Sequence, residues 1–415
     1  MRELTDSGCP WIGKIPVNWN NSKIKFEYEV TLGKMVQPKQ EHANDTLENY
    51  LCAANIKWDG IDESVHKQMW LSEKEKEQYL LHKGDILVTE GGSIGVSSVY
   101  NGEFEPCYFQ NSANRLRSKK GNNTKFGYYW MNVVVNGGYI DSVCNKATIS
   151  HYTKDKLSET PILAIPISEQ NAIVTYLDEK CAAIDESIQK RKEIIEKLQE
   201  YRKAVITQAV FDPTRTNAET IKLKYIFDIV AGATPKSDIE SFWDGSISWV
   251  TPADYKSDDK YVSHGAKTIT DAGYESCSTT LVPKGSLVVS KRAPVGTVAI
   301  AANELCTNQG CLSCIPRKDI NSEFYYYVLY SMTEHMKILA SGTTFQEISQ
   351  TSFMNMKVPY CNKAVQDAIV ISLNEKCVKI GEMLSKQQAI IDKLEEYKKS
   401  IIYNAVTGKI DCRPS

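Results

Sequence analysis

Short clusters of basic side chains are the part of this 415-residue sequence best suited to bind a charged partner. Three such clusters occur, at residues 115–120, 291–292 and 317–318. Phosphate binding depends on local concentrations of Lys and Arg, so the net charge of −2 neither supports nor excludes a nucleic-acid partner. A single cluster of this kind is more often part of a solvated loop than of a binding site. The structural elements that carry the clusters are therefore needed to interpret them.

Residues that could carry out covalent catalysis do not form a recognisable set. The sequence lacks the GxxxxGK[ST] loop that holds nucleotide phosphates and the HExxH zinc motif. It also lacks the Asn/Asp-Pro-Pro-Tyr/Phe tetrapeptide with which amino-methyltransferases bind an adenine amino group. The six histidines are scattered and none belongs to a triad-like motif. We therefore expect a noncatalytic chain.

The twelve cysteines are scattered too, and Cys52, Cys181 and Cys377 stand where core side chains are expected. Cys311 and Cys314 are closely spaced, but they lack the second pair of ligands that a structural zinc site needs. We expect these two cysteines in a buried strand.

The elements that position the basic clusters occur twice in the chain. Residues 177–184 and 194–203 recur in similar form as residues 373–380 and 390–399, a constant displacement of 196 positions. Two copies of a globular unit, each followed by a long helix, predict a pseudo-symmetric molecule. Such a molecule is suited to a pseudo-symmetric or bipartite partner.

Both repeated segments have the 4-3 spacing of apolar residues that is typical of a coiled coil. The predicted seam contains Leu177, Ile184, Ile188, Ile195, Leu198, Leu373, Ile380, Leu384, Ile391 and Leu394. One helix cannot bury such a seam alone, and the chain supplies one matching partner. We therefore expect an intramolecular antiparallel coiled coil. A helix of about 40 residues spans roughly 60 Å, so the helix pair would also set the distance between the two heads.

Two heads precede the two helices. The sequence predicts a first head at residues 1–165, a central helical segment at 166–212, a second head at 213–358 and a C-terminal helical segment at 359–415. Short strands and helices are mixed in the heads without strict alternation, which favours the α+β class. The expected fold is two similar α/β heads joined by two long helices, with pseudo-twofold symmetry.

The best match between the heads is a turn, a short buried strand and a glycine-containing loop. The loop reads Glu-Gly-Gly-Ser at residues 90–93 and Lys-Arg-Ala-Pro at residues 291–294. One framework with different loop chemistry is expected if each head recognises a different target. Asp85 and Glu90 could share a divalent cation, but Ser286 and Lys291 replace them in the second head, so we expect no metal site.

Four further stretches resemble the specificity subunit of type I restriction-modification systems. They are residues 6–19, 165–170, 176–185 and 405–411. Each is short, but they occur in the order of that family, and the resemblance covers nearly the whole chain. One departure is that residues 358–363 lack the Ser-Glu-Gln helix start found at residues 168–170. Contacts of a modification subunit at that end are expected to differ.

The resemblance implies that each head is a target recognition domain that reads one half of a split site in double-stranded DNA, with the helices as spacer. It also implies partners on separate polypeptides: two modification (methyltransferase) subunits, and restriction or translocase subunits. S-adenosylmethionine would bind the modification subunit, and this chain would hold no cofactor. Basic side chains would contact phosphates, and polar loop side chains would read base edges.

We predict that DNA is contacted by side chains in the loops after the glycine-containing strands and before the long helices. In the first head they are Thr89, Ser93, Arg115, Arg117, Lys146, Ser150 and His151. In the second head they are Ser290, Lys291, Arg292, Lys318, Thr343, Thr344 and Gln346. Each is also compatible with an ordinary polar loop position.

Two other functions are compatible with parts of the sequence. A two-headed coiled-coil scaffold that binds proteins without DNA specificity would share the architecture, and the near-neutral charge leaves it open. A free-standing nuclease or methyltransferase would need the catalytic motifs that are missing. The chain has no apolar stretch of membrane-span length and a polar start, so we expect it in the cytoplasm without membrane contact. The bases read and the gap between them depend on loop geometry that the sequence does not give.

Overall fold

The computed structural model describes residues 2–144, 151–216, 219–256, 259–341 and 346–413. It divides into two compact units, the first with residues 1–191 and 389–415 and the second with residues 192–388. Each unit combines one head with the adjoining parts of both long helices. These units therefore cut across the four segments expected from the sequence.

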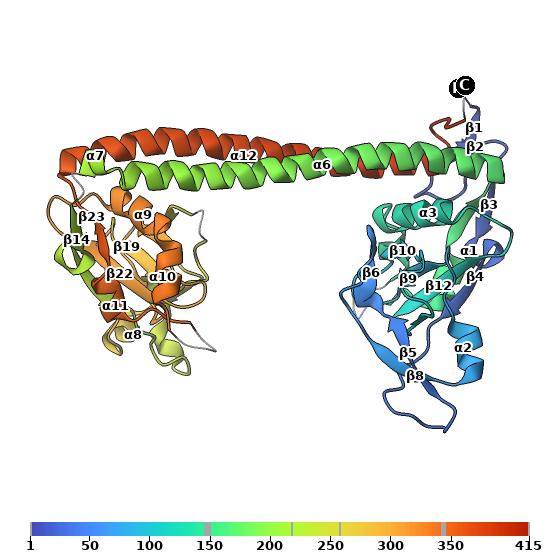
Figure 1. Ribbon diagram of the computed structural model, residues 1–415, viewed down its shortest axis with the longest axis horizontal. Coiled ribbons are helices and arrows are strands. Elements are labelled where there is room, and N and C mark those ends of the chain that lie inside the picture. Colours follow the sequence, from blue (N-terminus) through green and yellow to red (C-terminus); the bar gives the residue numbers. More distant parts are fainter. Residues whose placement is uncertain (1, 145–150, 217–218, 257–258, 342–345, 414–415) are drawn as a thin grey trace. The chain divides into compact units, whose positions relative to one another are not determined.

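The first head is built on a four-stranded antiparallel sheet of order β10-β9-β12-β4 (Figure 1). These strands are β10 (Ser97–Val99), β9 (Ile86–Thr89), β12 (Ala113–Ser118) and β4 (Tyr28–Leu32). A second sheet has the order β11-β5-β8, with β11 (Tyr108–Phe109), β5 (Thr46–Leu51) and β8 (Gln68–Leu71). Three strand pairs complete the head: β3 (Asn20–Lys23) with β13 (Pro161–Ala164), β1 (Leu4–Asp6) with β2 (Lys14–Pro16), and β6 (Ile56–Lys57) with β7 (Gly60–Ile61). Its helices are α1 (Ile24–Glu27), the 3-10 helix η1 (Ala53–Asn55), α2 (Glu73–Tyr79), α3 (Thr124–Asn136), α4 (Tyr139–Val143) and α5 (Lys154–Glu159).

The second head repeats this plan with one additional strand, β17, at the edge of its main sheet and without counterparts of the pairs β1-β2 and β6-β7 among the described residues. Its main sheet has the order β15-β22-β19-β20-β17, and its second sheet the order β18-β16-β21. The strands are β15 (Phe227–Ala231), β22 (Cys311–Pro316), β19 (Leu287–Ser290), β20 (Val298–Ala301), β17 (Tyr261–Val262), β18 (Lys267–Ile269), β16 (Trp243–Val250) and β21 (Cys306–Thr307), with the pair β14 (Thr220–Lys222) and β23 (Lys357–Pro359). Its helices are α7 (Pro213–Thr216), η2 (Leu223–Tyr225), η3 (Glu240–Phe242), α8 (Asp271–Glu275), α9 (Ser322–Ser331), α10 (Thr333–Leu339) and α11 (Gln350–Met354).

The central strands β9 and β19 explain the uninterrupted apolar runs of the sequence. Every side chain of both strands is buried, because each strand lies between two neighbours and both faces of its sheet are covered. Ile86 and Val88 belong to the cluster beneath α3, whereas Leu87 packs on the opposite face with Phe109. The buried strands that the sequence predicted are confirmed.

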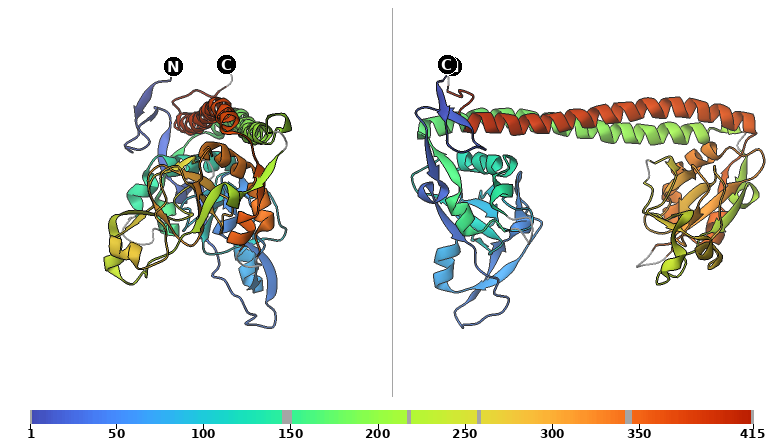
Figure 2. Two further views of the ribbon diagram at one scale, coloured as in Figure 1. Left: turned by 90° about the vertical axis from the view of Figure 1, so that its left-hand side faces the viewer. Right: turned by 180° about the vertical axis from the view of Figure 1, so that it is seen from behind.

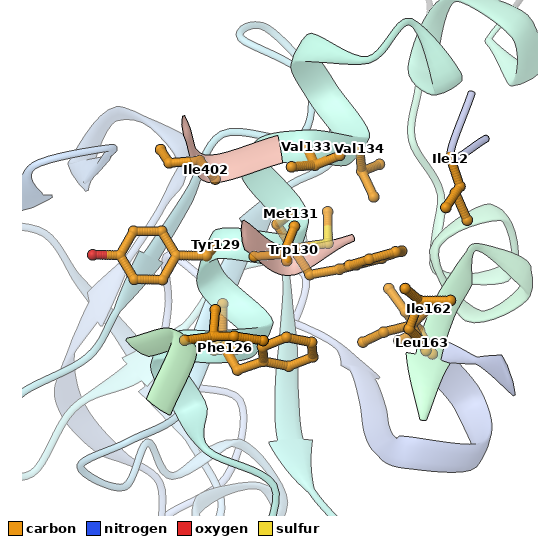
Figure 3. Close-up of a cluster of buried hydrophobic side chains, with 14 of the residues drawn as sticks. Ile12, Phe126, Tyr129, Trp130, Met131, Val133, Val134, Ile162, Leu163 and Ile402 are labelled. Carbon is orange, nitrogen blue, oxygen red and sulfur yellow. The ribbon is translucent and has the colours of Figure 1, made fainter. Parts of the chain in front are cut away.

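Helix α3 forms the centre of the core of the first unit. Its residues Phe126, Trp130 and Val134 are buried in one cluster with Ile162 from β13 (Figure 3). Ile402, from the second long helix, joins the same cluster. The first head therefore folds around a core to which Ile402, 240 residues beyond Ile162 in the chain, also contributes.

The two long helices are α6 (Ile167–Val210) and α12 (Lys363–Val406). In the first unit the start of α6 packs with the end of α12 in one buried cluster, and in the second unit the end of α6 packs with the start of α12. All ten predicted seam residues are buried or half-buried, and most residues between them are exposed. The predicted antiparallel pair of helices with a 4-3 seam is confirmed.

Polar residues in the seam are accommodated differently in the two units. In the first unit Lys398 forms an ion pair with Asp185 across the helices, with Nζ 2.6 Å from Oδ2. In the second unit Arg202, at the matching position, lies over the ring of Tyr330 from α9 at 5.8 Å. A long cation thus finds a partner at each end of the seam without interrupting the heptads.

The two ends of the chain meet on the first unit (Figure 2). Arg2 lies 2.8 Å from Glu169 and 3.0 Å from Asp411, while Tyr403 donates a hydrogen bond to the carbonyl oxygen of Ile12 at 2.8 Å. These contacts fasten the N-terminal segment to the start of α6 and the end of α12.

The cysteines of the chain are free thiols. Cys311 and Cys314 lie in strand β22 and are fully buried, as expected, and burial raises the pKa of Cys311 to about 12. Within the described residues, no group of His, Cys, Asp and Glu side chains is arranged to hold a metal ion. The described helices also include none that combines the length and the apolar character needed to cross a membrane.

Candidate nucleic-acid interface

The loop after the central strand is held by the same backbone bonds in both heads. The N–H of Thr89 donates to the carbonyl of Val96 at 2.9 Å, and the N–H of Gly95 donates to the carbonyl of Thr89 at 3.0 Å. Ser290 and Gly296 make the corresponding bonds in the second head, each at 2.8 Å. Gly95 and Gly296 have φ angles of 76° and 85°, a conformation that favours glycine. The two loops therefore share one backbone design.

The hydroxyl groups at the start of these loops also have matching partners. The Thr89 hydroxyl donates to the carbonyl of Ser93, and the Ser290 hydroxyl donates to the carbonyl of Arg292 at 2.6 Å. Thr89 and Ser290 are buried. Both were predicted to contact DNA, and their placement instead favours a role in shaping the loop.

A second segment, just before the last strand of each head, lies beside the loop. The N–H of Tyr152 donates to the carbonyl of Glu90 at 2.8 Å, and the N–H of Ile348 donates to the carbonyl of Lys291 at 3.0 Å. We call residues 90–94 and 151–152 the first loop surface, and residues 291–295 and 346–348 the second loop surface. The structure thus brings together segments that are far apart in the sequence.

The first loop surface combines a carboxylate, a hydroxyl and an imidazole. Glu90 accepts a hydrogen bond from the side-chain amide of Asn114 at 3.3 Å. The ring of His151 lies against Gly91, where an added Cβ would be 3.3 Å from ring atoms. Ser93 and His151 are exposed. This surface therefore presents mainly acceptor groups beside an imidazole that can donate or accept.

The second loop surface carries cations at the matching positions. Lys291 and Arg292 both pair with Glu347, each with a nitrogen–oxygen distance of 2.8 Å. The two cations hold the pKa of Glu347 below its ordinary value. Arg292 remains half exposed, so its guanidinium is oriented by Glu347 and still faces solvent. This surface presents oriented donor groups.

Arg115 and Arg117 are committed to contacts inside the first head. Arg115 is only 3 % exposed, donates to the carbonyl of Leu80 at 3.0 Å, and has its pKa lowered by burial. Arg117 forms two hydrogen bonds with the carboxylate of Asp85, at 2.7 and 2.6 Å, which raise its pKa. Both lie on one face of β12 because side chains two apart in a strand point the same way. These placements favour a packing role and leave little guanidinium surface for DNA.

The remaining predicted residues fall into two groups. Gln346 is exposed on the second loop surface, whereas Lys318 is exposed at the other end of the sheet, beyond the last residue of β22. Lys146, Ser150, Thr343 and Thr344 lie outside the described residues.

Three residues on or beside the loop surfaces were not among the predicted DNA contacts: Glu90, Asn114 and Glu347. A signal for two of them exists, because Glu90 and His151 in the first head match Lys291 and Glu347 in the second. An acid beside an imidazole in the first head thus stands against a cation beside an acid in the second. Asn114 gave no such signal, since its role depends on the pairing of β12 with β9.

Each head joins its long helix through one buried glutamine. Gln170 accepts from the N–H of Asn123 at 2.8 Å and donates to the carbonyl of Ile165 at 3.0 Å. Gln366 makes the same bonds in the second unit, to the N–H of Asn321 and the carbonyl of Cys361, both at 2.8 Å. The departure noted in the sequence therefore leaves the glutamine in place.

The acidic residue that the second helix lacks has an internal role in the first. Glu169 accepts a hydrogen bond from the Trp19 indole at 3.1 Å and pairs with Arg2 at 2.8 Å. Its counterpart at the 196-residue displacement is Val365. Glu169 binds the N-terminal segment, and this segment belongs to the first unit. Among the described residues, the second helix has no such segment to bind, which explains why it lacks an acidic residue at the matching position.

Comparison with known proteins agrees with this architecture. The family model of the type I restriction modification DNA specificity domain matches residues 16–197 and again residues 216–407. The chain is 35 % identical to the MjaIX type I restriction enzyme specificity subunit of Methanocaldococcus jannaschii over 178 residues. This matched segment covers 42 % of this chain and 40 % of that protein. It is 23 % identical over 297 residues to the EcoR124I/EcoR124II specificity subunit of Escherichia coli, or 68 % of this chain and 70 % of that one.

A solved structure shares the fold of nearly the whole chain. It is described as giving the structural basis underlying complex assembly and conformational transition of the type I R-M system. One of its chains has a TM-score of 0.75 at 16 % identity, over 95 % of this chain and 99 % of the other. The predicted α+β fold with two heads and two long helices is confirmed. Because the family model matches both halves, the chain belongs to the type I restriction modification DNA specificity family and contains two copies of its domain.

Proposed function

We propose that this chain reads a bipartite DNA site, with each loop surface recognising one half-site. The observation that carries the proposal is the difference in side-chain charge on one backbone framework that both heads share. Backbone bonds hold both loops alike, yet one surface carries Glu90 and His151 and the other carries Lys291, Arg292 and Glu347. Two readers with different side chains on one framework are suited to two different sequences.

The exposed side chains suggest how bases are read. Arg292 is fixed by Glu347 and half exposed, which suits the paired hydrogen bonds that arginine makes with guanine. On the first loop surface, a carboxylate such as Glu90 suits the amino group of cytosine, and Ser93 and His151 are exposed beside it. Lys146, Ser150, Thr343 and Thr344 remain predicted contacts in the neighbouring segments.

Partner subunits are a further part of the proposal. Two methyltransferase subunits would dock where each head meets the long helices, because the Gln170 and Gln366 junctions join head and helix in the same way in both units, with contacts that differ at the start of the second helix. Restriction or translocase subunits would complete the assembly, and the chemistry on DNA would belong to these partners.

Selection from a random DNA library tests the proposal. The chain, alone and with a partner methyltransferase, would be incubated with the library, and the bound DNA sequenced. We expect two constant half-sites separated by a gap of unselected bases. If no sequence is enriched even with the partner present, the recognition proposal fails, and a protein-binding scaffold becomes the better account.

The role of the helices can be tested by changing their length. Inserting seven residues at matching positions of α6 and α12 keeps the heptad register and adds about 10 Å. The unread gap should lengthen by about 3 base pairs while both half-sites stay the same. Altered half-sites with an unchanged gap would contradict a spacer role for the helices.

A further inference from the structure

Each head carries an exposed aromatic ring at the same position, next to a lysine. Phe26 and Tyr225 are 56 % and 58 % exposed. Lys25 lies over the Phe26 ring at 5.2 Å, and Lys224 lies over the Tyr225 ring at 5.3 Å. Neither ring contributes to a core, so packing within the head does not explain why an aromatic residue stands at both positions.

Further lysines surround Tyr225 in the second head. Lys222 in β14 stands directly opposite Lys357 in β23, in the register of this two-stranded sheet. Like charges directly opposite on neighbouring strands destabilise a sheet. Lys318 lies nearby, because the preceding Arg317 donates to the carbonyl of Tyr225 at 3.5 Å. Among the described residues no acidic side chain pairs with Lys222, Lys318 or Lys357.

The matching region of the first head neutralises its own charge. Glu159 accepts hydrogen bonds from both Lys23 and Lys25. Lys120 pairs with Glu27 at 3.0 Å. The counterparts of these acids in the second head are Asn355 and Ile226. The framework is duplicated, but only the second copy keeps its positive charge unpaired.

We propose that Lys222, Lys224, Lys318 and Lys357, together with Tyr225, form a phosphate-binding surface for the DNA backbone on the second head. We call these five residues the second-head lysine surface. Opposed lysines that no acid pairs with cost stability in the free protein, and an anion between them would relieve that cost. Protein interfaces are depleted in lysine, whereas phosphate contacts are made largely by Lys and Arg. The chemistry therefore fits a nucleic-acid backbone better than a protein surface.

The second-head lysine surface lies at the other end of the sheet from the second loop surface. Ser290, which begins the loop, pairs with Cys311 at the start of β22, whereas Phe227, next to the lysines, pairs with Pro316 at its end. A six-residue strand spans about 17 Å. The lysines would thus contact phosphates away from the bases read, and their contribution should not depend on sequence.

Charge removal tests this surface with an internal control. The variant K222Q/K224Q/K318Q/K357Q is compared with K23Q/K25Q/K119Q/K120Q, which removes four lysines from the corresponding region of the first head. Lys23, Lys25 and Lys120 match Lys222, Lys224 and Lys318, and Lys119 is the fourth because Pro161 stands at the position of Lys357. Dissociation constants are measured over a series of salt concentrations, for the selected DNA site and for an unrelated duplex of the same length.

We expect the second-head variant to bind both duplexes at least about 10-fold more weakly near 0.1 M salt, with the slope of log K against log salt reduced by about 2 to 4. The first-head variant should change the slope by less than about 1, because most of its lysines are already paired. The bases selected from a library should not change. A variant with arginine at the four positions should keep the wild-type slope.

Three results would overturn the proposal. The first is an unchanged affinity and slope, and the second is a loss of affinity confined to the specific site. The third is normal DNA binding together with weaker assembly with the methyltransferase, which would assign the surface to an acidic protein. A thermal midpoint at or above that of the wild type excludes misfolding as the cause, since the Lys222 and Lys357 repulsion is removed. The proposal rests on DNA binding by this chain, but the unrelated duplex reports on the lysines even if no half-site is ever selected.

Discussion

The two heads share four strands of the main sheet in the same order and close their loops with the same backbone bonds, but they differ in charge at several positions on and beside this framework. Glu90 stands against Lys291, His151 against Glu347, and Glu159 against Asn355. Buried sheet residues are constrained from both faces, whereas the loops are constrained only through their backbone. Loop chemistry is therefore free to change without cost to the framework, as a chain with two different targets requires.

The largest contrast between the heads should appear in their cores. Trp130 is fully buried in α3, and the matching residue of α9 is the buried but smaller Val328. Trp130→Ala should destabilise the first unit by about 3–5 kcal/mol, and Val328→Ala should destabilise the second by about 2 kcal/mol or less. Calorimetry of each variant would show which part of the unfolding transition moves. Equal shifts for the two variants would contradict the separate cores.

The Asp85–Arg117 pair is an ionic feature that only the first head possesses. The matching residues of the second head are Ser286 and Ile315. Asp85→Ser should cost about 2–3 kcal/mol, because it leaves the partly buried Arg117 without its carboxylate. The double variant D85S/R117I copies the second head and should recover much of that loss. Chemical denaturation of both variants checks this, and a double variant less stable than the single one would count against the comparison.

The sequence predicted the periodic parts of this molecule well. The seam residues recur every three or four positions, and the apolar run 86–88 between a turn and a glycine-containing loop is typical of a buried strand, so both predictions depend on local sequence. Arg115 and Arg117 are adjacent to other basic residues in the sequence, which predicts an exposed basic cluster. In the fold both side chains lie on the same face of β12 and bond to groups inside the head. Glu347 could not be assigned because its partners Lys291 and Arg292 lie more than 50 residues away and meet it only in the folded head.

Single substitutions on the loop surfaces should affect one half-site at a time. Arg292→Ala should weaken binding of the wild-type DNA site by about 1–3 kcal/mol and relax selection at one position of the second half-site. Glu90→Ala should do the same in the first half-site. Competition binding with DNA mutated in one half-site at a time would separate the two effects. Loss of selection in both half-sites from one substitution would contradict independent heads.

The smallest predicted effect concerns the acid that neutralises the first head. Hydrogen bonds from Lys23 and Lys25 lower the pKa of Glu159 to about 2. The folded pKa lies below the unfolded value of about 4.3, so this stabilising contribution is complete above that pH and is lost as the pH falls toward 2. Glu159→Gln should remove this pH-dependent contribution to the stability of the first head. It should also raise the affinity for unrelated DNA about two- to fivefold, because Lys23 and Lys25 lose their acidic partner. Binding to an unrelated duplex at neutral pH, with Asn355→Gln as the matched control, would measure the gain, and no gain would argue against self-neutralisation.

Exchange of one loop surface is the most direct test of the claim that each head reads its own half-site. Residues 291–294 would be replaced by the Glu-Gly-Gly-Ser of residues 90–93, together with Glu347→His, and the bound DNA would be selected from a random library. We predict that the second half-site changes while the first half-site and the gap remain those of the wild type. An unchanged second half-site, or a change in both half-sites, would contradict the assignment of recognition to these loop surfaces.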